Sequence, residues 1–324
     1  MNKAAFIAII TAIICILPST TARAIESYEA DSVSVVYYIK DISPESLMKV
    51  FNALDRKVTG NNVAVKLSTG ESGKSNHLSP NLIKGLVKEV NGTIVECNTA
   101  YAGNRNTTEA HYRAAQEHGF TDIARVDIMD ADGQVELPVD GGYHLSADIV
   151  GKNFLDYDFL VVLSHFKGHQ MAGFGGALKN ISIGIASADG KARIHSAGAT
   201  DSPAEAWNKL PEQDAFIESM ADACQAVTSH IGDRVIYISI ANRLSVDCDC
   251  NANPAEPEMT DLGILASLDP VAIDRACLDL VYNSSDPGKK HLIERIESRH
   301  GQHILDAAEL LGVGTQQYFL ITLE

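Results

Sequence analysis

The chain has 324 residues, 45% of them apolar, which is enough for a substantial core in one large or two smaller domains. Its 42 acidic side chains outnumber 26 basic ones, so the formal net charge is −16. This charge argues against nucleic acid or an anionic membrane surface as the main partner, because both attract a positively charged contact face.

The first 24 residues have the pattern of a secretory signal peptide. Lys3 supplies a positive charge, residues 4–17 are apolar, and Ala22-Arg23-Ala24 has the small-x-small form of a cleavage site. The apolar run is shorter than the ~20 residues of a membrane-spanning helix, and no later run is long enough. We therefore expect cleavage after Ala24 and an exported protein, periplasmic or secreted, without an integral membrane segment.

Short β-branched runs alternate with helical patterns along the rest of the chain. This alternation predicts an α/β fold with a mostly parallel sheet and flanking helices. The predicted strands are residues 33–38, 62–67, 93–97, 124–129, 135–139, 159–163, 233–240, 262–266 and 318–323. The predicted helices are residues 44–55, 80–90, 107–118, 214–229, 270–282 and 303–311. A polar stretch at 196–211 divides residues 25–324 into two expected lobes, 25–195 and 212–324, with the site between them.

Basic side chains and glycines follow the buried strand at 159–163 directly. This position is the carboxyl edge of the sheet, where open α/β folds bind ligands. Glycines allow close backbone approach, a helix N-terminus attracts anions, and histidine suits proton transfer near neutral pH. The alternative is a tight turn with solvated side chains, but several histidines and lysines within about thirty residues favour a site.

We expect His165, His169 and Lys179 to be catalytic. Arg105 ends a loop after the third predicted strand, where it would contact an anion or serve only as loop filler. The expected ligand contacts are Lys167, Gly173, Gly175, Gly176, Asn180 and Arg105.

Five cysteines follow the expected cleavage site, so in an oxidising compartment at least one thiol stays unpaired within the chain. They are Cys97, Cys224, Cys248, Cys250 and Cys277, and their disulfide status stays open. No C-x-x-C pair occurs among them, which excludes a standard zinc ribbon.

Residues 247–250 place two carboxylates and two thiols side by side, a possible metal-binding set that needs a further ligand such as His169 or His195. The alternative is a polar loop with oxidised thiols. The expected metal ligands are His195, Asp247, Cys248 and Cys250.

Residues 164–180, SHFKGHQMAGFGGALKN, resemble the central signature of a family of uncharacterised iron–sulfur centre proteins, domain of unknown function 362. The similarity extends through NTAYAGNR at 98–105 and DCDC at 247–250 to DLGILASLDPVAID at 261–274. Many relatives carry a ferredoxin-like insertion with C-x-x-C-x-x-C spacing shortly after the position of His195. Residues 196–223 contain no cysteine here, so a ferredoxin-type 4Fe-4S cluster is not expected.

One segment is also similar to nickel-pincer lactate racemases. His169, Lys179 and His195 match the order and spacing of that signature. The resemblance implies that Lys179 attaches the cofactor, His195 is a nickel ligand and His169 is a general acid/base. No residue of this chain could be matched to the second catalytic histidine of those enzymes.

The leading hypothesis is a metal- or cofactor-dependent site for acid/base chemistry on a small anion, with nickel, zinc or iron as the metal. One alternative is a non-catalytic periplasmic protein that binds a ligand or a metal. Another is an iron–sulfur or thiol redox protein, in which Cys248 and Cys250 would change reversibly between thiols and a disulfide.

Overall fold

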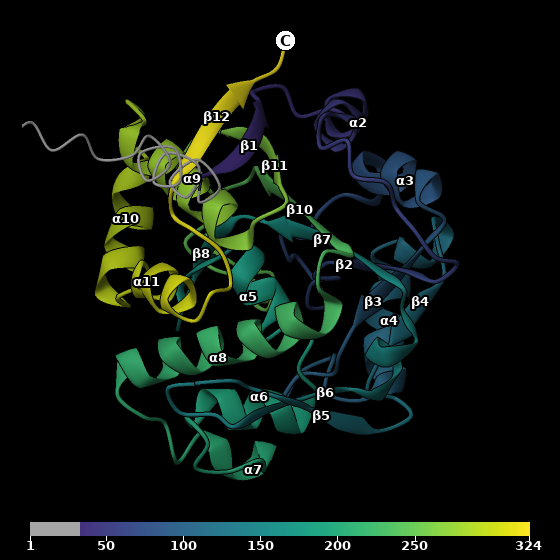
Figure 1. The fold of residues 1–324 in the computed structure, drawn as a ribbon, viewed down its shortest axis with the longest axis vertical. Helices are drawn as coiled ribbons and strands as arrows, with labels where there is room; N and C mark the ends of the chain where they lie inside the picture. Colours follow the sequence, from purple (N-terminus) through teal and green to yellow (C-terminus); the bar gives the residue numbers. More distant parts are fainter. Residues whose placement is uncertain (1–32) are drawn as a thin grey trace, which may run out of the picture. The chain divides into compact units, whose positions relative to one another are not determined.

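The computed structural model describes residues 33–324, of which Ser34–Glu324 form one compact unit. Its centre is an eight-stranded sheet (Figure 1). In sheet order the strands are β12 (Tyr318–Thr322), β1 (Ser34–Ile39), β11 (Gly263–Ser267), β10 (Val235–Ala241), β7 (Phe159–His165), β2 (Val63–Lys66), β3 (Gly92–Glu96) and β4 (Val126–Ile128). Only β11 runs antiparallel to its neighbours, β1 and β10. The expected α/β fold with a mostly parallel sheet is confirmed.

Helices cover both faces of this sheet. They are α2 (Pro44–Ala53), α3 (Pro80–Glu89), α4 (Thr108–Glu117), α5 (Ala177–Ile181), α6 (Ala188–His195), α7 (Pro203–Ala206), α8 (Gln213–Ile231), α9 (Pro270–Asn283), α10 (Lys289–Ser298) and α11 (His303–Leu310), with 3-10 turns η1 (Phe120–Asp122) and η2 (Lys152–Asp156). Two small hairpins complete the fold, β5 (Gln134–Pro138) with β6 (Ala147–Gly151) and β8 (Lys167–His169) with β9 (Gly173–Gly175).

The alternating side chains of β7 belong to two cores on opposite faces of the sheet. Leu160 and Val162 pack into the core that includes α5, α8, α9 and α11. Val161 and Leu163 pack into the core formed with α2, α3 and α4. A strand buried on both faces requires the continuous apolar run seen at 159–163, because successive side chains point in opposite directions.

The sequence did not predict β6, β8, β9, α6, α7 and α10. The sheet is continuous across the expected lobe boundary, since β7 pairs with β10; the division into lobes stays a prediction.

Within the described residues, no helix combines the length and the apolar character needed to cross a membrane. The expected signal peptide lies outside the described residues.

A buried carboxyl in β6 should make stability depend on pH. Asp148 is fully buried, and burial raises its pKa to about 7, although the charge of Lys191 opposes this rise. Because an unfolded aspartate titrates near ~4, its contribution to stability is complete below that pH and is lost as the pH rises through 7. Between pH 5 and 8, wild type should lose about 2–3 kcal/mol more stability than Asp148→Asn.

Urea unfolding of both proteins at each pH measures this difference. Asp132→Asn is the matched control, because its side chain is exposed and the substitution removes the same charge. Equal pH slopes for wild type and Asp148→Asn would show that Asp148 ionises in the folded protein as easily as in the unfolded chain.

Candidate active site

The carboxyl ends of β2, β3 and β7 meet at a cavity with a volume of about 110 Å³. Its lining includes five basic side chains and two acidic ones, an excess of positive charge in a chain that is acidic overall. The basic residues are Lys66, Arg105, Lys167, Lys179 and Lys191, and the acidic residues are Glu96 and Asp249. This balance favours an anionic ligand.

One wall of the cavity is an ion-pair cluster at the ends of β2 and β3. Lys66 Nζ lies 3.0 Å from Glu96 Oε2, and Arg105 Nη1 lies 3.3 Å from Glu96 Oε1. Arg105 also donates to Tyr101 Oη at 3.0 Å and pairs with Glu71 at 3.5 Å. The expected anion contact Arg105 lines the cavity, but most of its guanidinium is already engaged by these protein groups.

A second cluster at the end of β7 is organised by Asp249. His165 Nδ1 donates to Asp249 Oδ1 at 2.9 Å, and Lys167 Nζ donates to Asp249 Oδ2 at 2.8 Å. The other ring nitrogen of His165 donates to the Asn242 carbonyl at 2.6 Å. Although burial alone would raise it, these two cationic partners hold the pKa of Asp249 well below its usual range.

The expected catalytic role of His165 stays a prediction, and the contacts of its ring do not favour it. Both of its ring nitrogens face acceptors, so neither offers a lone pair to a substrate or a metal. Lys167 is likewise occupied by Asp249 and by the His165 carbonyl at 2.9 Å. Both residues line the cavity, but their contacts hold its wall in place.

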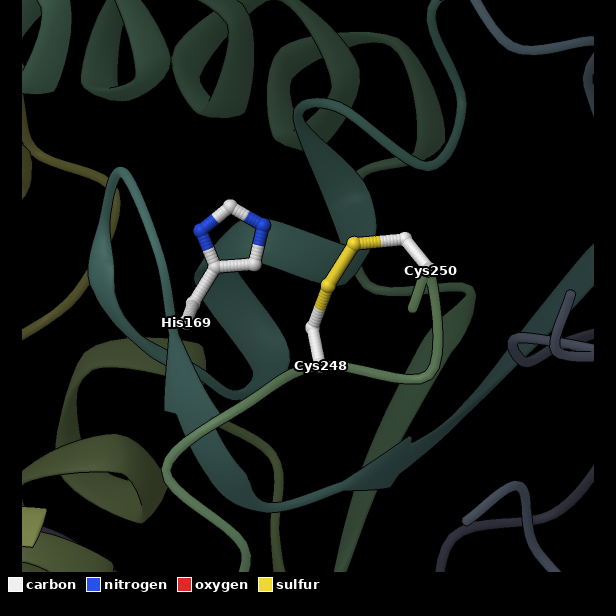
Figure 2. A group of neighbouring side chains, drawn as sticks. All are labelled: His169, Cys248 and Cys250. Carbon is white, nitrogen blue, oxygen red and sulfur yellow. A yellow bond between two sulfur atoms is a disulfide. The ribbon is translucent and has the colours of Figure 1, made fainter. Parts of the chain in front are cut away.

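His169, at the end of β8, presents an N–H group to the cavity. Its Nδ1 accepts from the backbone N–H groups of Met171 and Ala172, at 3.2 and 2.9 Å. An imidazole nitrogen that accepts carries no proton, so the proton lies on Nε2. Figure 2 shows that this nitrogen is turned toward Cys248 and Cys250. Burial, with the charge of Lys179, lowers the pKa of His169 well below its usual range, so the ring is neutral.

His195, at the end of α6, has the opposite tautomer. Its Nδ1 lies 2.6 Å from the Lys191 carbonyl, which can only accept, so Nδ1 carries the proton and Nε2 has a free lone pair. The ring stacks on Phe216 and is 8% exposed. Burial lowers its pKa to about 4, so the lone pair is available at neutral pH.

Lys179, in α5, is the cavity cation without a partner among the described residues. No carboxylate or carbonyl of residues 33–324 forms an ion pair or hydrogen bond with its Nζ, in contrast to Lys66, Lys167 and Lys191. Burial, followed by the positive charges of Lys167 and Lys66, lowers the pKa of Lys179 to about 7. This amine exchanges its proton near neutral pH.

The glycine loop before α5 serves packing, and its helix N-terminus is already occupied. The N–H groups of Ala177 and Leu178, expected to face an anion, instead donate to Asp274 at 2.7 and 2.9 Å. A Cβ at Gly176 would collide with this carboxylate. Gly175 lies beside Lys179 in the cavity lining.

Two further expected ligand contacts have structural partners. Gly173 has a φ of +78° and does not line the cavity. A Cβ at this position would collide with the Cα of Gly301. Asn180 lines the cavity, donates to Ser164 Oγ at 3.1 Å and accepts from Lys66 Nζ at 3.0 Å. Its amide therefore links strands β2 and β7 to α5.

Residues 247–250 contribute a disulfide and a possible metal-binding group. Cys248 and Cys250 are joined by a disulfide, and the other three described cysteines are free and buried. Ligand atoms of His169, Cys248 and Cys250 lie within 4.8 Å of one another (Figure 2). Metal binding there would require reduced cysteines and loss of the proton from His169 Nε2. Of the expected metal ligands, Asp247 pairs with Arg295 at 3.5 Å instead, and His195 is not part of this group.

Three cavity residues, Lys66, Glu96 and Lys191, were not predicted from the sequence. Lys66 and Glu96 are the last residues of β2 and β3, so a charged residue at the end of an apolar strand was the available signal. Lys191 lies in α6, which has no clear sequence pattern, and its Nζ donates to the Ala186 carbonyl at 2.5 Å.

Comparisons with known proteins identify one family and two distantly similar structures. The family model of a domain of unknown function, DUF362, matches residues 63–279. The lactate racemase apoprotein from Thermoanaerobacterium thermosaccharolyticum is 14% identical, with a TM-score of 0.42 over 89% of this chain and 82% of that one. A protein from Thermotoga maritima is 11% identical, with a TM-score of 0.41 over 84% and 61%. No curated protein matches the sequence. At these TM-scores, neither structure supports an argument about function.

Proposed function

This chain belongs to the DUF362 family, and we propose that its cavity is an active site for proton transfer on a small anionic substrate. The observation that carries the proposal is the presence of two neutral imidazoles with opposite tautomers in one cavity with an unpaired lysine. One imidazole can donate and the other can accept, and the lysine supplies a counter-charge. These are the components that acid/base catalysis on an anion requires.

Each of the three side chains has a separate role in this proposal. Lys179, in its ammonium form, binds the negative group of the substrate. The free Nε2 of His195 accepts a proton from the substrate, and the bound anion raises the pKa of this imidazole as it does so. The Nε2–H of His169 donates a hydrogen bond to the oxygen on which negative charge develops.

The size of the cavity limits the substrate to a small molecule. Its 110 Å³ is below the ~300 Å³ at which pockets for drug-sized ligands begin. The neutral amine of Lys179 and the lone pair of His195 would suit attachment of a metal-bearing cofactor. The roles above use only the side chains of the chain itself.

Deuterium exchange tests this function on a panel of small carboxylic acids. Small 2-keto and 2-hydroxy carboxylates are incubated with the protein in D2O. Proton NMR follows loss of the C3–H signal next to the keto group of the 2-keto acids and of the C2–H signal of the 2-hydroxy acids. We expect exchange above the protein-free rate for at least one acid. In His195→Gln, the rate should fall by roughly 10²–10⁴-fold, the typical contribution of a general base.

His291→Gln is the matched control, because His291 is an exposed residue of α10. Its exchange rate should equal that of wild type. Binding of these acids without exchange in wild type would contradict the catalytic proposal and favour a non-catalytic binding protein.

The proximity of His169, Cys248 and Cys250 supports a second candidate function for the reduced protein, metal binding. With a metal present, Cys248 and Cys250 would supply two thiolates, which suit zinc, iron or nickel. Export, expected from residues 1–24, would place this site in a periplasmic or extracellular compartment.

A further inference from the structure

The Cys248–Cys250 disulfide lies in the wall of the cavity rather than in the core. Both residues belong to the cavity lining, and Figure 2 shows the S–S bond facing the ring of His169. Cys248 is 3% exposed, whereas Cys250 is only partly buried. A small molecule in the cavity would therefore reach the sulfur of Cys250 first.

This disulfide contributes little to the stability of the fold as a cross-link. It joins residues only two positions apart, and the entropy that a disulfide removes from the unfolded chain grows with the length of the loop it closes. Asp249, between the two cysteines, is held by His165 and Lys167, and its carbonyl accepts from Glu71 N–H at 2.8 Å. The loop is thus anchored without the S–S bond, so reduced thiols would stay close enough to join again.

The charge of the cavity indicates which small thiols would react with the Cys248–Cys250 disulfide. Five basic side chains against two acidic ones attract anions, and Lys179 has no protein partner among residues 33–324. The Nε2–H of His169 faces the two sulfur atoms (Figure 2).

We propose that Cys248 and Cys250 form a redox-active pair whose reaction partner is a small thiol that carries a carboxylate. The thiolate of the small thiol attacks Cys250 Sγ and forms a mixed disulfide with it. The Cys248–Cys250 bond breaks, and Cys248 leaves as a thiolate. A second thiol then attacks the mixed disulfide, which releases the oxidised partner and the Cys250 thiolate. Two thiols are oxidised, one disulfide is reduced by two electrons, and the two thiol protons pass to the two cysteines. This inference does not rest on the proton-transfer proposal.

Three thiols of similar size and different charge test this pairing. Mercaptoacetate is anionic, 2-mercaptoethanol is neutral and cysteamine is cationic. Each rate of reduction is divided by the rate of the same thiol with a small soluble disulfide, and alkylation with mass spectrometry identifies the cysteines that react. We expect the normalised rate to be at least roughly tenfold higher for mercaptoacetate than for cysteamine.

The free cysteines Cys224 and Cys277 are an internal control for unfolding, because both are buried and neither lines the cavity. They should stay unmodified while Cys248 and Cys250 are alkylated. Reduction only together with modification of these two would require unfolding and would overturn the redox role. Equal normalised rates for the three thiols would overturn the choice of an anionic partner.

Two variants locate the reaction. Lys179→Gln should remove most of the preference for mercaptoacetate, whereas Lys88→Gln, a change at an exposed lysine of α3, should leave it intact. In Cys248→Ser, Cys250 is a free thiol, so the disulfide of mercaptoacetate is the probe: exchange should place one mercaptoacetate on Cys250 as a mixed disulfide and release the other as a thiolate, and the adduct should accumulate because no second cysteine can displace it. An unchanged preference in Lys179→Gln, or no mixed disulfide in Cys248→Ser, would contradict the proposed reaction in the cavity.

Discussion

Asp249→Asn is expected to lower the free energy of unfolding by about 3–5 kcal/mol, the usual cost of removing one partner from a buried ion pair. Asp249 is 1% exposed and binds His165 and Lys167 with separate carboxylate oxygens. Asparagine keeps one acceptor but turns an NH2 group toward the second cation. One buried positive charge then has no counter-charge, and the 247–250 loop loses its anchor.

Urea unfolding at pH 7, followed by the fluorescence of the single tryptophan, measures this loss. Asp247→Asn is the matched control in the same loop. Its carboxylate pairs with Arg295 at 3.5 Å in a more exposed position, so its replacement should cost less than about 1 kcal/mol. Similar costs for the two variants would mean that the Asp249 cluster does not hold the cavity wall.

The affinity of the cavity for a small carboxylate such as glycolate is expected to depend on the ionisation of Lys179. Only the ammonium form attracts the anion, and the pKa of Lys179 is about 7. The dissociation constant should therefore be constant below pH 7 and rise by up to about tenfold per pH unit above it. Bound anion stabilises the ammonium form, so binding above pH 7 should take up a proton.

Calorimetric titration in two buffers with different ionisation enthalpies measures both the affinity and the proton uptake. At pH 6, Lys179→Met should bind glycolate roughly ten- to hundredfold more weakly, the value of a hydrogen bond to a charged group. Lys179→Arg keeps the charge and should bind without this pH dependence. A wild-type affinity that stays constant from pH 6 to 9 would show that Lys179 is not the anion-binding group.

These two experiments separate the fixed part of the cavity from its reactive part. Asp249, with His165 and Lys167, holds the wall, so its variants should act mainly on stability. Lys179 contributes no ion pair within the described residues, so its variants should act mainly on ligand binding. If Asp249 variants changed mainly ligand binding and Lys179 variants changed mainly stability, the two roles would be reversed.

The sequence by itself determined the fold class and the position of the candidate site. The α/β alternation and the apolar run at 159–163 are local patterns, and they correctly predicted a mostly parallel sheet. Parallel strands end at one edge, so the loops after β3 and β7 had to meet there. His169, Lys179 and His195, selected from sequence, all line the cavity at this edge.

Which of these side chains keep a donor or acceptor for a ligand could be seen only in the folded structure. Asp249 engages His165 from 84 positions away, and Asp274 engages the N-terminus of α5 from 97 positions away. While the disulfide is formed, neither thiol is available to a metal, and Asp247 pairs with Arg295. Residue types and spacing show what a side chain can bind, but its actual partner depends on which distant segments folding brings within hydrogen-bond distance.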